Sequence, residues 1–152
     1  MQLDKTDLRL LTLLQHDARL SNKELADKLG KSVTPVLLRR KKLEESGYIK
    51  KYMAIVDRHL INRSLMAFTS VQLKEHAEEL LHAFQQSVSR FEEVMSCHHM
   101  TGTYDYHLKI VVADMNAYHK FITEKLAKLP NVLTVQSSFV MAEVKDELAY
   151  TL

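Results

Sequence analysis

The chain has 152 residues, of which 46% are hydrophobic and 26% are charged, with 3 glycines and 2 prolines. This composition is typical of a globular protein with one domain or two small ones, and it excludes a long disordered linker. A single cysteine excludes an internal disulfide framework, and no apolar run approaches the roughly 20 residues of a membrane helix. Because the first residues lack a secretory signal pattern, we expect a cytoplasmic protein without membrane partners.

Charge is unevenly distributed along the chain. The net charge at pH 7 is +2, but residues 1–52 carry 12 lysines and arginines against 7 acids, whereas residues 53–152 carry 9 against 12. A basic first third attached to a mildly acidic remainder favours an anion-binding module joined to a different one.

Two helices are predicted at the start of the chain. Leucines recur on one face of residues 4–16, which indicates an amphipathic helix, and Asp4 and Asp7 suit the positive end of its dipole. Ser21 and Glu24 have the spacing of a capping box, in which each side chain bonds the other residue's backbone N–H. The box predicts that a second helix begins there.

A third helix is predicted after a tight turn. Gly30 ends the second helix in a left-handed conformation, and either Ser32 or Thr34 caps the third, which runs to Gly47. The residues expected to face inward are Val36, Leu43 and Leu37.

Two short helices joined by a tight turn are typical of a helix-turn-helix DNA-binding domain. The N-terminal side chains of such a helix reach base edges in the major groove, and here they include Thr34, Leu37 and Leu38. The four cations at 39–42 would neutralise phosphates, and we expect Arg39 and Lys42 to share a face. A merely solvated charged face is the alternative, which the basic surroundings disfavour. The candidate DNA-binding residues are Ser21, Asn22, Ser32, Thr34, Leu38, Arg39, Arg40 and Lys42.

The second half of the chain alternates strands and helices. Residues 48–56 form either a strand or an extended hinge, and a polar connector follows. The predicted elements are then a strand at 65–73, a helix at 76–88, strands at 94–100 and 104–112, a helix at 115–129 and a strand at 132–144. This β-α-β-β-α-β order predicts a four-stranded antiparallel sheet with two helices on one face, and a second face that packs against a partner.

The overall prediction is an α+β protein in two parts. A helix-turn-helix, winged-helix-like domain spans 1–52, a hinge strand or linker spans 53–64, and a ferredoxin-like βαββαβ domain spans 65–152.

The loop at 101–105 is a candidate small-molecule site. Gly102 suits a simple hairpin turn, but a glycine loop also offers unhindered N–H groups to a carboxylate. Asp105 can bind an ammonium group, or it can be structural. The methionines of this half, at 95, 100, 115 and 141, are expected to fill the core, with an adaptable ligand pocket as the alternative.

No metal site is predicted at Cys97, His98 and His99. Adjacent strand residues point to opposite faces, so the two histidines cannot easily bind one ion, and Cys97 is expected to be buried.

The whole chain resembles the Lrp/AsnC, or feast/famine, family of transcription regulators. The resemblance rests on LDKTDLRLLTLLQHDARLSNKELADKLGKSVTP, LRRKKLEESGYIKKY, CHHMTGTYDYHLKIVVADMNAYHKFI and SSFVMAEVK, in this order and spacing. Four positions depart from the family pattern. Position 40 is usually aliphatic in the family but is Arg40 here, and position 38 is often polar but is Leu38 here. Thr103 stands where several relatives carry an acid, and Ala142 where many carry glutamate.

The resemblance implies a DNA-binding regulator that responds to a small molecule, usually an amino acid. The βαββαβ domains would form homodimers through their sheets, and the dimers would assemble into rings, commonly octamers. The effector would lie between subunits, near Met100, Thr101, Gly102, Thr103, Tyr104 and Asp105. No cofactor is implied.

Three other functions are alternatives to this one. An effector-independent, nucleoid-type DNA organiser remains the alternative within the same class. An enzyme is disfavoured because there is no activated nucleophile, acid–base pair or phosphate loop. A protein-interaction adaptor would leave the basic helix idle. The sequence therefore predicts a non-enzymatic, sequence-specific regulator of transcription that binds double-stranded DNA.

Overall fold

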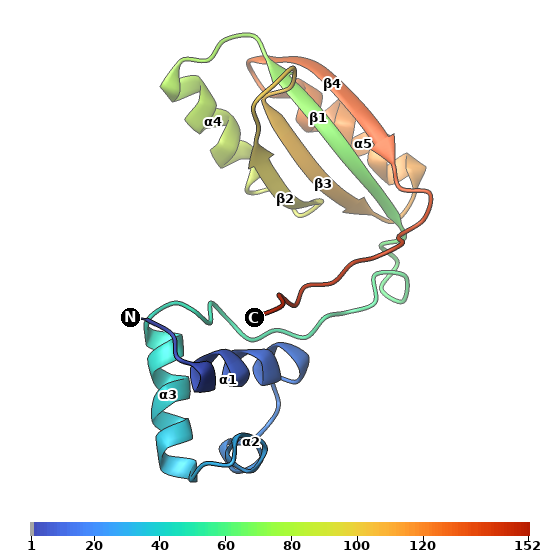
Figure 1. Cartoon of the computed structure of the whole chain (residues 1–152). Coiled ribbons are helices and arrows are strands. Elements are labelled where there is room, and N and C mark those ends of the chain that lie inside the picture. The colour runs from blue at the N-terminus through green and yellow to red at the C-terminus, as the bar shows by residue number, and fades with distance from the viewer. Residues whose placement is uncertain (1) are drawn as a thin grey trace. The chain divides into compact units, whose positions relative to one another are not determined.

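A computed structural model describes residues 2–152 of the chain (Figure 1). The chain forms two compact units. The helical unit comprises the chain up to Ile55 together with Lys145–Leu152, and the sheet unit comprises Val56–Val144. The sequence predicts that the segment Lys145–Leu152, called the C-terminal tail below, belongs to the second domain, but it packs with the first.

The helical unit contains the three predicted helices, α1 (Lys5–His16), α2 (Asn22–Leu29) and α3 (Val33–Glu45). Their inward faces meet in one core, whose buried residues are Leu10, Leu11, Leu14, Leu25, Ala26, Leu29, Val36 and Leu43. Burial of these side chains, at about 1.5–3 kcal/mol for each large one, is what holds three short helices that would be marginal in isolation.

The helix ends follow the capping signals in the sequence. Asp4 caps α1 and Ser21 caps α2, each within a complete capping box, and Gly30 closes α2 with φ 63°. Ser32 occupies the cap position of α3 without a side-chain hydrogen bond. Helix α3 ends at Glu45, before the predicted limit, because the chain turns at Gly47 with φ 75°.

Leu37 is a correction within α3. It was expected to face inward, but 45% of it is exposed, whereas Val36 and Leu43 are completely buried. At about 100° per residue, Leu37 is rotated well away from the line that joins Val36 and Leu43.

Residues 48–56 form an extended segment that is not part of a sheet, so the hinge alternative describes them better than the strand. The side chains of Met53, Ile55 and Val56 are exposed.

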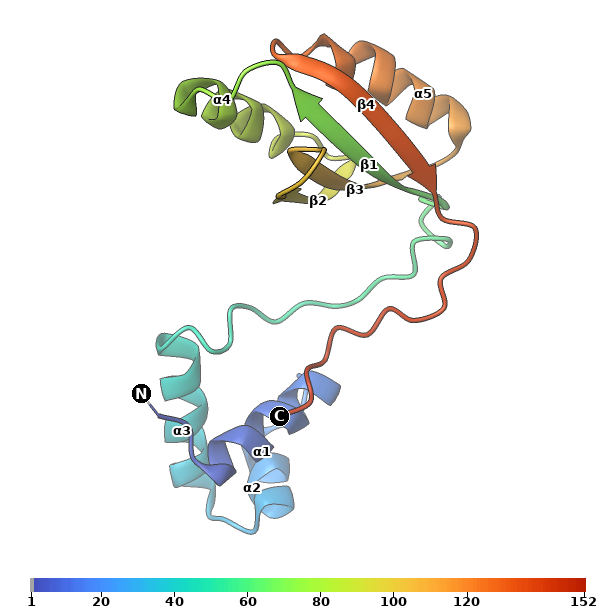
Figure 2. The same cartoon turned by 45° about the horizontal axis from the view of Figure 1, so that its top comes forward.

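The sheet unit has the predicted β-α-β-β-α-β order. Its elements are β1 (Leu65–Leu73), α4 (Glu78–Val88), β2 (Val94–His99), β3 (Tyr106–Val112), α5 (Met115–Glu124), a 3₁₀ turn (Leu126–Lys128) and β4 (Val132–Phe139). The sheet order is β2-β3-β1-β4 with every pair antiparallel. Figure 2 shows α4 and α5 on one face of this sheet.

Strand β4 is shorter than predicted because its partner ends. Phe139 pairs with Ala67, and the Val140 N–H donates to the Met66 carbonyl at 3.0 Å, close to the first residue of β1. Because β1 begins at Leu65, the residues after Val140 lie beyond the pairing with β1.

The covered face of the sheet forms the second core, between the strands and both helices. A hydrogen-bond chain runs through it, because the hydroxyl groups of Thr69 and Tyr118 lie 2.8 Å apart and Tyr118 also donates to Ser137. Thr69 is completely buried, so this pairing removes the cost of an unsatisfied hydroxyl.

Two expectations about sulfur-containing residues were wrong. Met95, Met100, Met115 and Met141 are all exposed instead of filling the core. Cys97 is exposed as well, because β2 is an edge strand without a neighbour on one side.

The side chain of Gln15 ties the C-terminal tail to α1. The Gln15 amide donates to the Tyr150 carbonyl at 3.1 Å and accepts from the Tyr150 N–H at 2.7 Å. Among residues 2–152, no helix is long and apolar enough to cross a membrane.

Candidate DNA-binding surface and effector loop

Arg39 of α3 bonds to the start of α1. Its Nη1 lies 2.6 Å from both Asp4 Oδ2 and Asp7 Oδ1, and the Asp7 side chain is only 5% exposed. Bonds from the Asp7 N–H and from Arg39 lower the pKa of Asp4, and the bonds to Asp7 and Asp4 raise the pKa of Arg39. The guanidinium therefore fixes α3 against the first turn of α1.

Arg40 also turns back into the helical unit. Its Nε lies 3.1 Å from Glu44 Oε1 and 3.2 Å from the Tyr52 hydroxyl, and Nη1 donates to the Leu20 carbonyl at 3.4 Å. The guanidinium carbon lies 5.0 Å from the centre of the Tyr52 ring, within the range of a cation–π contact. Burial alone would lower the pKa of Arg40, but the bonds to Glu44 and Tyr52 raise it.

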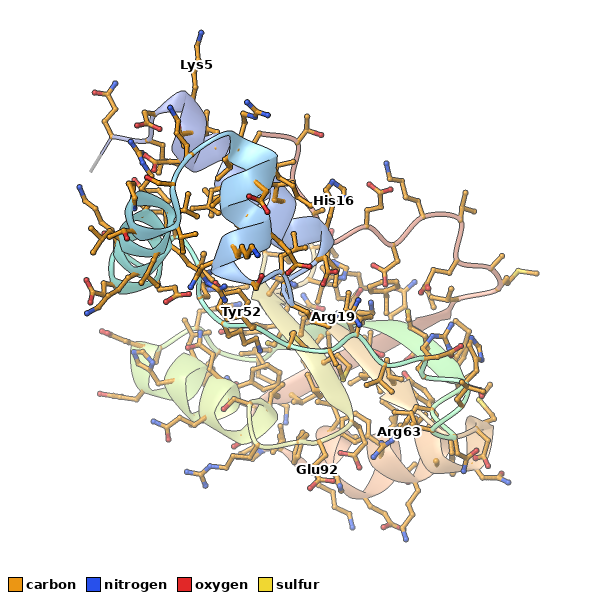
Figure 3. All side chains as sticks on the ribbon, turned by 90° about the horizontal axis from the view of Figure 1, so that it is seen from below. Lys5, His16, Arg19, Tyr52, Arg63 and Glu92 are labelled. Atoms are coloured by element: carbon orange, nitrogen blue, oxygen red, sulfur yellow. The ribbon has the colours of Figure 1, made fainter. Side chains whose placement is uncertain are left out.

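The other two cations of the run are directed to solvent. Lys41 makes a long pair with Glu45, at 3.6 Å between exposed side chains, and Lys42 is also exposed. Lys5, at the start of α1, projects away from the helical unit in Figure 3, which also shows Tyr52 after α3. The sequence predicts that Arg39 and Lys42 face the DNA together. In the structure only Lys42 is directed to solvent, because the Arg39 guanidinium is bonded to carboxylates of α1.

The candidate residues before these cations fall into two groups. Ser21 is occupied by its cap, since its Oγ accepts from the Glu24 N–H at 3.2 Å, and Asn22 Oδ1 is buried without a hydrogen-bond partner among the described residues. Ser32, Thr34 and Leu38 are all exposed.

The loop between β2 and β3 is closed by hydrogen bonds at its two ends. The Met100 N–H donates to the Asp105 carbonyl at 2.8 Å, and the Asp105 N–H donates to the Val71 carbonyl at 2.9 Å. Gly102 has φ 118°, a backbone conformation that residues other than glycine rarely adopt. Thr101, Gly102 and Thr103 are exposed, and the Tyr104 hydroxyl donates to Gln136 of β4.

Asp105 is the anchor of this loop. Its Oδ2 accepts from the Leu73 N–H at 2.7 Å, and its Oδ1 lies 2.7 Å from His76 Nε2. Burial would raise the pKa of Asp105, but the bonds from Leu73 and His76 outweigh burial and lower it. Both carboxylate oxygens are therefore already bonded within the sheet unit.

Hollows occur on the surface of the sheet unit. One of about 440 Å³ lies between α5 and β4, and its lining includes Met115, Tyr118 and Phe139. Another, of about 420 Å³, lies on the face without helices, where Phe68, His98 and Met100 line it.

Several of these contacts were not foreseen from sequence. The sequence indicates only a helix-dipole role for Asp4 and Asp7, and it predicts no role for Tyr52, His76 and Gln136. Because the partners lie 12 to 35 residues apart, no local pattern marks them.

Together these features define a class of protein: a winged helix-turn-helix unit that binds DNA, joined to a ligand-binding domain. Residues 3–50 match the model for winged helix-turn-helix DNA-binding domains, and residues 66–150 match the model for the Lrp/AsnC ligand binding domain. The chain belongs to the Lrp/AsnC family, and it is a DNA-binding transcriptional regulator.

The similarity extends over nearly the whole chain. The leucine-responsive regulatory protein of Escherichia coli K12 is 40% identical over 144 residues, which cover 95% of this chain and 88% of that protein. A transcriptional regulator of Neisseria meningitidis, solved in complex with L-Met, has a TM-score of 0.94 at 37% identity and covers 99% of this chain and 97% of its own. An AsnC family regulator of Agrobacterium tumefaciens has a TM-score of 0.93 at 35% identity, and the match covers 98% of this chain and 97% of that regulator.

Proposed function

We propose that this regulator acts without enzymatic activity and adjusts its binding to specific operators when an α-amino acid binds the sheet unit. The observation that carries the proposal is the joining, in one chain, of a basic helix-turn-helix unit to an Lrp/AsnC ligand binding domain. Such a protein acts on chromosomal DNA, which supports the expected cytoplasmic location.

On the DNA side, we assign different roles to the four cations at 39–42. Lys41 and Lys42 bind phosphates, because they are exposed at the end of α3. Arg39 and Arg40 hold α3 in position, because their guanidinium groups are bonded to carboxylates within the helical unit. Lysine contacts of this kind supply affinity that falls steeply with salt.

The remaining candidate DNA-binding residues also fall into two groups, one that contacts bases and one that contacts the sugar–phosphate backbone. Ser32 at the cap of α3, and Thr34 and Leu38 in its N-terminal half, approach the bases, and all three are exposed. Ser21 and Asn22, at the start of α2, approach the sugar–phosphate backbone of the DNA.

On the effector side, we propose that the exposed N–H groups around Gly102 bind the ligand's carboxylate, and that Met100 contacts its side chain. The exposure of this loop, the positive φ of Gly102 and the L-Met found on the Neisseria relative support the assignment. Both oxygens of Asp105 have partners, which supports a role in holding the loop and not in binding the ammonium group.

We further propose a homodimer that assembles to a larger ring, such as an octamer. The helix-free face of the sheet, with Phe68 47% exposed, would pack against a second copy. A dimer would place two copies of α3 on an imperfect palindrome with half-sites about one DNA turn apart.

The test uses the full-length protein and a duplex obtained by selection from random DNA. Binding is measured by fluorescence anisotropy, alone and with each of the twenty amino acids, and assembly is followed by light scattering. We expect at least one apolar amino acid to change affinity or assembly, since an effector acts only by binding one state better than another. If no amino acid changes either, the nucleoid-type alternative is favoured, and equal binding to a scrambled duplex would favour it further.

A further inference from the structure

Arginine is the side chain that most often recognises guanine, because its fork bonds O6 and N7 together. Helix α3 contains only two arginines, and both turn away from its exposed face. Arg39 bonds to two carboxylates of α1, and Arg40 bonds to Glu44 and covers the Tyr52 ring, so that 21% of its side chain is exposed. Recognition of guanine would require one of these groups to leave its partners.

The N-terminal half of α3 instead exposes hydrocarbon. Val33, Leu37 and Leu38 have 43%, 45% and 62% of their surface exposed. The same unit buries Leu10, Leu25 and Leu43 completely, so the exposure does not follow from a weak core. Leu38 is rotated by about 200° from the buried Val36, which places it at the centre of the exposed face.

The charges around these leucines indicate what covers them. Lys31 precedes the helix, and Lys41 and Lys42 follow within the next turn, and all three are exposed. Apolar side chains ringed by cations suit a polyanion with apolar groups in a groove more than they suit an apolar protein surface. In the major groove of DNA, the apolar group is the C5-methyl of thymine.

We propose that Leu37 and Leu38 recognise thymine methyl groups, so that this regulator selects its half-sites at T·A pairs and makes no arginine contact to guanine. This inference rests on the proposed function, in which α3 enters the major groove. It specifies the chemistry of that contact and identifies Leu38 as its main determinant.

The experiment removes one methyl group at a time from the selected duplex. Each thymine of a half-site is replaced by uracil, which keeps every hydrogen-bonding group, and affinity is measured by anisotropy with the full-length protein. At about 0.8 kcal/mol for one buried methyl, each contacted thymine should cost about fourfold in affinity. Replacement of half-site guanines by 7-deazaguanine, which lacks N7, should leave affinity unchanged.

Two matched variants connect the methyl groups to the helix. Leu38→Ala should abolish the uracil penalty at one or more positions, because the partner of the methyl is gone. Leu148→Ala is the control, since Leu148 of the C-terminal tail is 63% exposed and lies outside α3. It should keep the full penalty.

The outcomes separate this inference from the function on which it rests. If no duplex is preferred over its scrambled form, the proposed sequence-specific function fails. If a duplex is preferred but uracil costs nothing, the methyl contact is wrong and the function stands. If 7-deazaguanine weakens binding tenfold, the half-site guanines are contacted, and the part of the inference that excludes a guanine contact is overturned. A uracil penalty that survives both Leu37→Ala and Leu38→Ala would assign the methyl contact to another element and overturn the inference.

Discussion

Asp7 is expected to stabilise the helical unit more than any exposed acid does, and Asp7→Ala tests this. Its carboxylate accepts from the Asp4 N–H at 3.1 Å and from Arg39 Nη1 at 2.6 Å, and its side chain is 5% exposed. Loss of the reciprocal capping-box bond from the Asp4 N–H costs about 1 kcal/mol. The ion pair adds roughly another 1 kcal/mol, a value reduced for solvent screening because 37% of the Arg39 side chain is exposed.

The total, about 2 kcal/mol, corresponds to a roughly 30-fold larger population of the opened helical unit. Native-state hydrogen exchange of the full-length protein measures this directly, because the slowest amides report the opening of their own unit. Core amides of α1, α2 and α3 should exchange about 30 times faster in Asp7→Ala, and those of the sheet unit should not change.

Asp17→Ala is the matched control. Asp17 pairs with Arg19, whose side chain is 92% exposed, so exchange should change little. If Asp7→Ala and Asp17→Ala give the same exchange rates, then the contact to Arg39 does not hold α3 in place. The positioning role assigned to Arg39 would then be wrong.

Three further predictions concern other contacts. Tyr118→Phe should lower the free energy of unfolding of the sheet unit by about 1–3 kcal/mol in urea, because it leaves the buried hydroxyl of Thr69 without its partner. Because the pKa of Asp105 is lowered in the fold, its contribution to stability is present above the ordinary aspartate pKa and is lost as the pH falls through the lowered one. The Leu73 amide should therefore exchange faster, after correction for intrinsic rates, at the acidic end of a pH series, and Asp105→Asn should remove this dependence. Gln15→Ala should release the C-terminal tail, seen as faster exchange of its amides.

Each of these has a clear contrary result. Unchanged unfolding of Tyr118→Phe would mean that Thr69 finds another partner. A pH dependence at Leu73 that persists in Asp105→Asn would assign it to a different group. For the tail, Lys5→Ala on the same helix is the control, and equal exchange in both variants would show that Gln15 does not hold it.

The elements of this fold were predictable because their signals are local. The capping box at Ser21 and the glycine at 30 place the ends of α2, and the leucine periodicity of residues 4–16 indicates α1. The strand β1 likewise follows from its own alternation and matches the predicted range.

The parts that sequence did not predict depend on distant residues. The end of β4 is set by where β1 begins, and the exposure of Cys97 is set by the edge position of β2. The same holds for the site, since the roles of Arg39 and Asp105 are decided by partners on other elements. A run of four cations predicts a basic surface, but only the packing of α3 separates the arginines from the lysines.

The most direct test of the central claim compares two duplexes. Binding of the full-length protein to its selected duplex and to the scrambled form is measured by anisotropy at physiological salt. If α3 recognises sequence, the selected duplex should bind about a thousandfold tighter or more, the lower range for specific DNA-binding proteins. Equal affinity for both duplexes would contradict the account.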